Sequence, residues 1–128
     1  MNTEFCVKNG FQLPDEFHGH PGGISRVMMG PNARNERRPA ALNTERLVIH
    51  TNEYAPGGES GEAHSHRNQE QAFYILEGNM EVTVGDKTYT AGPGDGVLLP
   101  RNVMHSHRNL GETPLKFLFI SAMLDETS

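Results

Sequence analysis

The sequence has a single cysteine, Cys6, which has no second cysteine with which to form an internal disulfide. One unpaired thiol suits a reducing compartment, so we expect a cytoplasmic protein. No apolar run approaches the roughly 18 residues of a membrane span. Residues 1–10 also lack the apolar core of a signal peptide. We therefore expect no membrane partner.

Basic charge is also scarce. The chain has 11 Lys and Arg residues against 16 Asp and Glu residues, which gives a formal net charge of −5. A nucleic-acid surface requires a basic excess, so we expect no nucleic-acid partner. A length of 128 residues allows one domain with a single core and is too short for two.

Turn-forming residues are abundant, with 14 glycines and 8 prolines, and helical periodicity is slight. This pattern predicts an all-β fold of short strands. Turn signals at intervals of roughly 8–12 residues favour a sandwich or a barrel. We expect residues 1–44 to form an N-terminal arm and first strand of the same domain, residues 45–122 the barrel core, and residues 123–128 a tail. The expected strands are 24–29, 47–53, 63–66, 71–76, 80–84, 87–90, 97–99, 104–108 and 115–122.

Histidines carry the strongest chemical signal. His64 and His66 are two residues apart in a segment expected to be extended, so their side chains point to the same face. Gln71 follows five residues later, and His105 arrives with a second segment. Three imidazoles and one amide oxygen in a barrel interior would form a mononuclear metal site with room for water or substrate. Imidazole suits Fe, Ni, Cu or Zn, and Mn is possible, so the expected cofactor is one divalent transition metal ion.

The spacing around these residues resembles the two sequence blocks of the cupin superfamily, with Gln in place of the usual Glu. The resemblance covers residues 45–122 and implies a jelly-roll barrel, also called a double-stranded β-helix. The Gln-containing pattern is similar to that of cupins that convert unsaturated uronates to keto sugars, in which Gln occupies the corresponding ligand position. The block residues are Gly58, His64, His66, Gln71 and Gly78, then Gly94, Pro100, Asn102 (in place of a second Gly), His105 and Asn109.

Gln71 and Glu70 compete for the place of fourth ligand. A carboxylate is the better metal ligand, but a one-residue slip reverses the facing of a strand side chain. Gln71 shares its expected face with Phe73 and Ile75, so strand register favours Gln71. A neutral amide leaves both positive charges on a divalent ion, which makes the ion a stronger Lewis acid.

Other polar residues permit two interpretations each. His107 has the same parity as His105 and should face the cavity, either as an acid/base group or as a polar wall residue. His18 and His20 lie in a Gly/Pro-rich arm and are interpreted as loop histidines. Four arginines are interpreted as solvated loop charges, with an anion-attracting rim as the alternative: Arg26, Arg34, Arg37 and Arg38.

The expected function is a metal-dependent enzyme with a small oxygenated substrate, for which a sugar acid is one candidate. The ion would coordinate a carbonyl or vicinal hydroxyls while a base, His107 or Glu70, moves a proton, giving isomerisation, tautomerisation or elimination. The alternatives are an iron-dependent dioxygenase and a metal- or ligand-binding cupin without turnover. We also expect a homodimer, in which the N-terminal arm covers exposed sheet edges.

Overall fold

The computed structural model describes residues 6–31 and 40–124, and every regular element in these two ranges is a β-strand. This confirms the predicted all-β class. Within the same ranges, no helix is long and apolar enough to cross a membrane. The strands are β1 (Gly23–Gly30), β2 (Leu42–Asn43), β3 (Leu47–Tyr54), β4 (Gln69–Glu77), β5 (Met80–Val84), β6 (Lys87–Ala91), β7 (Gly96–Leu99), β8 (His105–Asn109) and β9 (Leu115–Met123).

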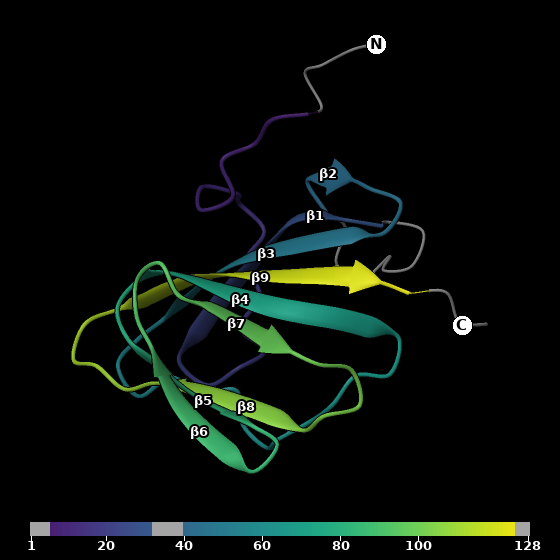
Figure 1. Cartoon of the computed structure of the whole chain (residues 1–128). Helices are drawn as coiled ribbons and strands as arrows, with labels where there is room; N and C mark the ends of the chain where they lie inside the picture. Colours follow the sequence, from purple (N-terminus) through teal and green to yellow (C-terminus); the bar gives the residue numbers. More distant parts are fainter. Residues whose placement is uncertain (1–5, 32–39, 125–128) are drawn as a thin grey trace.

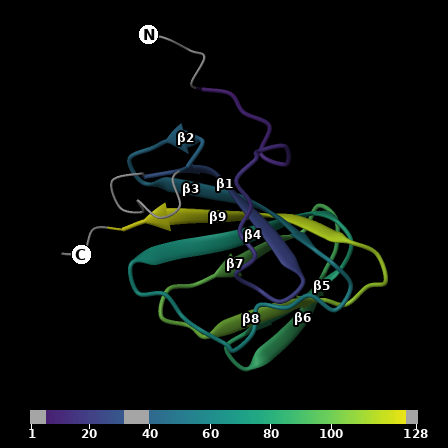
Figure 2. The same cartoon turned by 180° about the vertical axis from the view of Figure 1, so that it is seen from behind.

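The strands form two layers that face each other (Figure 1). One layer is a six-stranded sheet in the order β2-β1-β3-β9-β4-β7, and the other is a three-stranded sheet in the order β6-β5-β8. Figure 2, the view from behind, shows the same two layers with β1 crossing in front. Strands adjacent in a sheet are often distant in sequence, which is the topology of a jelly roll.

The core lies between the two sheets. Along β4, Gln71, Phe73 and Ile75 are buried, whereas Glu70 and Tyr74 are exposed. This alternation is the one that the sequence predicted from strand register, because successive side chains of a strand point to opposite faces. The three-stranded sheet closes the core from the other side. The core cluster consists of Tyr54, Phe73, Ile75, Met80, Val82, Ala91, Leu99, Leu115 and Phe117.

Most predicted strands are confirmed within a residue or two, but the strand expected at 63–66 is wrong. Only His64 makes a ladder contact there, an isolated bridge to His105. Two residues later, the carbonyl of His66 accepts a hydrogen bond from the amide of Asn102, which lies in a turn rather than in a strand. The segment around Asn102 turns away from His66 at that point, so the ladder between the two segments is not continued.

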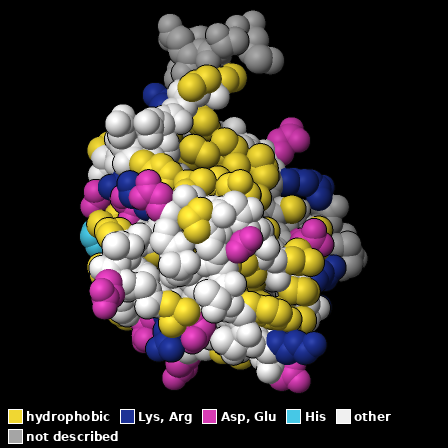
Figure 3. All heavy atoms as spheres, turned by 60° about the vertical axis from the view of Figure 1, so that its left-hand side comes forward, with side chains coloured by type: hydrophobic (Ala, Val, Ile, Leu, Met, Phe, Trp, Pro, Cys, Tyr) yellow, Lys and Arg dark blue, Asp and Glu magenta, His cyan; other side chains and the backbone are white. Residues whose placement is uncertain are grey.

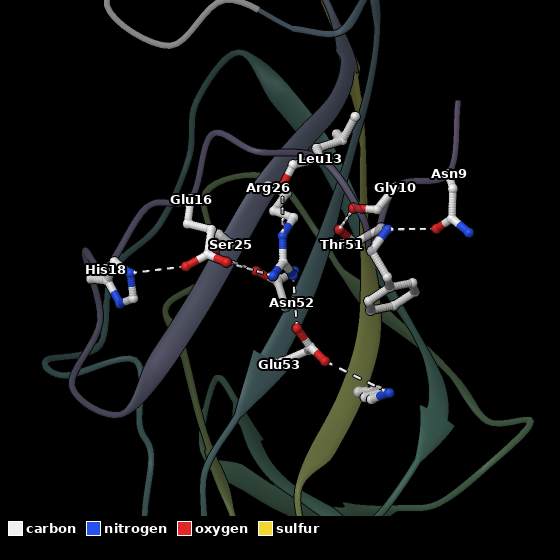
Figure 4. Close-up of polar contacts among 12 residues, drawn as sticks. Asn9, Gly10, Leu13, Glu16, His18, Ser25, Arg26, Thr51, Asn52 and Glu53 are labelled. Carbon is white, nitrogen blue, oxygen red and sulfur yellow. Dashed lines mark hydrogen bonds and ion pairs between the residues drawn. The ribbon is translucent and has the colours of Figure 1, made fainter. Parts of the chain in front are cut away.

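The N-terminal arm packs on the outer face of the six-stranded sheet, where Arg26 anchors it (Figure 4). Arg26 is only 8% exposed. Its guanidinium donates to Glu53 at 2.7 Å, to Glu16 at 2.8 Å and to the carbonyl of Leu13 at 3.2 Å. The interpretation of Arg26 as a solvated loop charge or rim residue is therefore wrong. The other three arginines of that prediction lie outside the described residues.

A close approach next to Arg26 holds the arm in place. The Thr51 hydroxyl donates to the carbonyl of Gly10 at 2.5 Å, and Thr51 is the β3 residue paired with Arg26 of β1. A Cβ on Gly10 would lie 2.6 Å from Thr51 Cγ2 and 2.7 Å from Met28 Sδ. Only glycine lets the arm backbone come this close to the sheet.

We expect Arg26→Met to destabilise the protein by about 2 kcal/mol, because it leaves two carboxylates and a carbonyl without their shared donor. Chemical denaturation measures this loss. Limited proteolysis should also cut the arm faster in the variant.

The matched control is Arg108→Met. Arg108 pairs with Glu81 at 2.9 Å, but its side chain is 55% exposed. Exposed ion pairs contribute little, so this change should cost less than about 0.5 kcal/mol. Equal losses in the two variants would show that Arg26 does not anchor the arm.

The outer surface includes large apolar side chains. Tyr74 of β4 is 43% exposed and Leu98 of β7 is 60% exposed. On the face shown in Figure 3, hydrophobic side chains gather in a broad patch with charged side chains around its margin. An apolar surface of this kind suits a contact with another molecule. The homodimer expected from the sequence stays a prediction.

Candidate metal centre and its cavity

Three histidines converge inside the barrel. His64 and His66 come from the segment between β3 and β4, and His105 is the first residue of β8. Each offers a ring nitrogen, and these nitrogens all lie within 4.8 Å of one another. Nitrogens bound about 2.0–2.1 Å from a shared ion lie about 3 Å apart, so the spacing of this cluster is of the order that one metal ion requires.

Backbone hydrogen bonds fix this convergence. The amide of His64 donates to the carbonyl of His105 at 3.0 Å, and the amide of His105 donates back at 2.7 Å. His64 and His66 are half-buried, whereas Ser65 between them is exposed. The two imidazoles therefore point to the same side, as their spacing predicts, although the segment is not a full strand.

Asn102 helps to place His66. Its amide donates to the His66 carbonyl at 2.8 Å, and its φ is 64°, in the left-handed region. Asn tolerates this conformation better than most residues because its short polar side chain interacts with the local backbone. This explains how Asn102 replaces the glycine of the second sequence block.

Gln71 presents an unpaired oxygen on the inner wall of the same cavity. Its Nε2 donates to Oε1 of Gln69 at 2.9 Å, and the hydroxyl of Ser121 donates to the same Gln69 oxygen at 2.8 Å. Oε1 of Gln71 is buried and has no hydrogen-bond partner. A buried acceptor without a donor is costly, whereas a cation would satisfy it. The donor set therefore fits a divalent metal.

Glu70 does not share this position. Its side chain is exposed on the opposite face of β4, and Glu70 is not among the described residues that line the cavity. Glu70 therefore lies on the wrong face to act as the fourth ligand or as a base, and both of these alternatives are wrong. The physical reason is the strand register that brings Gln71 inward.

Two of the three histidines are held in the form that binds metals. Burial, with a smaller contribution from His64 and His66, lowers the pKa of His105 to about 4. Burial and then His64 also lower the pKa of His66. Near neutral pH both rings are therefore uncharged and keep a nitrogen lone pair available for a metal.

A second set of polar side chains in the cavity is joined by hydrogen bonds and consists of His107, Tyr54 and His20. Nε2 of His107 lies 3.0 Å from the Tyr54 hydroxyl, and Nδ1 of His20 lies 2.5 Å from the same hydroxyl. Burial lowers the pKa of His107 to about 3 and raises the pKa of the Tyr54 phenol. Nδ1 of His107 is buried without a partner. Near neutral pH His107 and Tyr54 are therefore neutral, and Nδ1 of His107 is free.

His20 lies in a loop, as predicted, but the arm folds back and places it in the cavity wall, which the sequence did not reveal. Sequence reasoning also missed Tyr54 and Gln69 as site residues. The second His-x-His at His18 and His20 was the available signal for this region. It offered no partner, because Tyr54 is 34 residues away and contacts His20 only in the folded chain.

The cavity that these residues line has a volume of about 420 Å³. This lies within the range of roughly 300–1,000 Å³ that is typical of small-molecule sites. Its described lining includes the three histidines, Gln71 and His107. The site can therefore hold a metal ion together with a small organic molecule.

Comparisons with known proteins identify the family of this chain. A family model of the cupin domain matches residues 50–121. A germin-like protein of Arabidopsis thaliana (subfamily 1 member 4) is 31% identical over 127 residues, which cover 88% of this chain and 56% of that protein. An uncharacterized protein of Methanocaldococcus jannaschii is 33% identical over 121 residues, which cover 94% of this chain and 90% of that protein. The chain thus spans about half the length of the germin-like relative and most of the length of the archaeal one.

Solved structures share the fold. A predicted oxalate decarboxylase of Thermotoga maritima aligns with a TM-score of 0.71 and 20% identity, covering 92% of this chain and 99% of that one. KdgF of Halomonas sp. aligns with a TM-score of 0.65 and 21% identity, covering 89% of this chain and 91% of that one. At these identities the likeness concerns the fold alone.

Proposed function

This chain belongs to the cupin family, and on that premise we propose that it is a metal-dependent enzyme acting on a small oxygenated substrate. The reaction class is isomerisation, tautomerisation or elimination by proton transfer. The observation that carries the proposal is the buried Oε1 of Gln71, which has no partner and lines the same cavity as His64, His66 and His105. We assign these four side chains as the metal ligands.

When bound, the metal supplies a Lewis acid that polarises a carbonyl or hydroxyl oxygen. The protein sets how strong that acid is. Gln69 accepts from Ser121 and from Gln71, so the Gln71 amide is held with its oxygen free. An amide oxygen carries no formal charge, so it does not reduce the charge of the ion as a carboxylate would.

His107 is the group that we propose moves the proton. Its free Nδ1 can accept a proton from a substrate carbon or hydroxyl, while its Nε2 passes one to the oxygen of Tyr54. Tyr54 in turn passes its own hydrogen to Nδ1 of His20. Because burial disfavours a charged imidazole at His107, the relay leaves His107 and Tyr54 neutral and the net proton on the His20 ring, which returns it along the same path when the substrate is reprotonated.

Hydrogen–deuterium exchange tests the proposal without knowledge of the natural substrate. Metal-loaded protein in D₂O should exchange the α-hydrogens of hydroxyacetone or 2-hydroxyacetophenone, measured by NMR. We expect His107→Asn to retain metal and to slow the exchange by about a hundredfold or more, the usual contribution of a positioned acid/base group.

Two controls make the test specific. Metal-free protein should show no exchange above buffer, and His18→Asn, at an exposed position of the arm, should exchange at the wild-type rate. An unchanged rate in His107→Asn would remove His107 from the mechanism. Metal-dependent oxygen uptake by iron-loaded protein, with no exchange, would instead support the dioxygenase alternative.

A further inference from the structure

The cavity has two chemically different ends. One end holds the three clustered histidines and Gln71, and the other is largely apolar apart from His50, whose ring packs on Phe119 with 5.0 Å between the centroids. The apolar end is packed around Gly30, where a Cβ would meet Val27 Cγ1, Val48 Cγ2 and Ala40 Cβ, each at 3.8 Å. Phe119 also belongs to the cavity lining. Carbon atoms from three separate segments therefore form one wall of the cavity.

Strand register places these ends at opposite sides of the inner face. Gln71 of β4 pairs with Ser121 of β9, and Ser121 pairs with Val48 of β3. Neighbouring strands lie about 4.8 Å apart, so the backbones of Gln71 and Val48 are separated by about 10 Å. This span matches a small molecule with a polar head at one end and a ring or branched chain at the other.

The cavity wall offers no acidic or basic side chain other than histidine. Among the described residues that line the cavity there is no Lys, Arg, Asp or Glu. A second carboxylate, a phosphate or a row of hydroxyls placed against the carbon atoms of Val27 and Val48 would lose its water there, which is unfavourable by several kcal/mol. The strand β9 contributes Phe117, Phe119 and Ser121 to the inner face and no carboxylate.

We propose that the substrate is amphiphilic, with one oxygenated head that faces the histidines and an aromatic or branched aliphatic tail that contacts the apolar end. The head rests on the proposed function, because it requires the metal site. The tail rests on the wall around Gly30 and is independent of the reaction catalysed. Polyhydroxylated acids and compounds with a second charge are excluded by the same wall.

Three keto acids with the same head test the tail. Pyruvate has a methyl group, benzoylformate has a phenyl ring, and 2-oxoglutarate has a second carboxylate on a short chain. Each is titrated into zinc-loaded protein by calorimetry. We expect benzoylformate to bind at least about tenfold more tightly than pyruvate, because it buries more apolar surface. We expect 2-oxoglutarate to bind no more tightly than pyruvate.

A pair of variants on β3 locates the tail. Val48→Thr keeps the side-chain shape and places a hydroxyl in the apolar wall, so it should weaken benzoylformate about fivefold and leave pyruvate unchanged. Ile49→Thr changes the next residue, whose side chain points to the other face of the sheet, and should affect neither acid.

The outcomes separate this inference from the proposed function. Equal binding of the three acids, or tightest binding of 2-oxoglutarate, would overturn the apolar tail while leaving the metal site intact. Failure of zinc to bind, or of every acid to bind zinc-loaded protein, would overturn the proposed function and with it the oxygenated head. Equal effects of Val48→Thr and Ile49→Thr would move the tail away from this wall.

Discussion

We expect His105→Ala to abolish stoichiometric metal binding and to leave the barrel folded. His105 supplies one of three ring nitrogens that lie within 4.8 Å of one another. Loss of a group that only orients a ligand costs 10–100-fold in metal affinity, so loss of a ligand should cost more than about a hundredfold. Metal content after dialysis, measured by mass spectrometry, reports this change.

The fold should survive because His105 holds the barrel through its backbone. Its amide and carbonyl pair with His64, and alanine keeps both groups. Circular dichroism and chemical denaturation confirm or refute the folded state. His18→Ala is the control for a histidine outside the cavity, since the His18 side chain is 63% exposed. Full metal content in His105→Ala would show that the ligand assignment is wrong.

Gly78→Ala has the largest effect that we expect on stability. Gly78 has a φ of +85°, and a Cβ there would lie 2.8 Å from the Pro114 carbonyl oxygen and 3.0 Å from Leu115 Cα. Both are backbone atoms, and Leu115 is fully buried, so neither can move freely. The variant combines left-handed strain with a backbone clash, and we expect a loss of about 3 kcal/mol or more in the free energy of unfolding.

Gly94→Ala is the matched control. Gly94 has nearly the same conformation, with a φ of +89°, but a Cβ there would meet no atom within 4 Å. It should cost only the conformational strain, about 1–2 kcal/mol. Urea denaturation of the two variants therefore isolates the clash. Equal losses would mean that the chain near Pro114 relaxes to accept a side chain.

Local pattern predicted the parts of this protein that local chemistry determines. The alternation along β4 identified Gln71 rather than Glu70 as the inward residue, because a strand side chain has only two directions. The tight turns that contain glycine predicted both ends of the strand Met80–Val84 correctly. The histidine spacing was equally informative, since residues two apart remain on one side even where the segment makes only one bridge.

Contacts between distant segments could not be predicted from the sequence. His20 reaches Tyr54 only because the arm doubles back over β1, and no periodic pattern in a Gly/Pro-rich arm signals such a path. The free oxygen of Gln71 depends on Gln69 and Ser121, and the latter two residues are 52 positions apart. Arg26 was misinterpreted for the same reason, because its partners come from the arm and from a neighbouring strand.

The segment that matches the family model, residues 50–121, does not line the whole cavity. β1 precedes it and supplies Val27 to the cavity, and the arm before β1 supplies His20. A protein shortened to begin at residue 45 would lack β1, so the edge of β3 would be unpaired and one side of the cavity would be open to water. A fragment cut to the family boundary, or a fusion that displaces the N-terminal arm, would therefore differ from the full chain in both solubility and ligand preference.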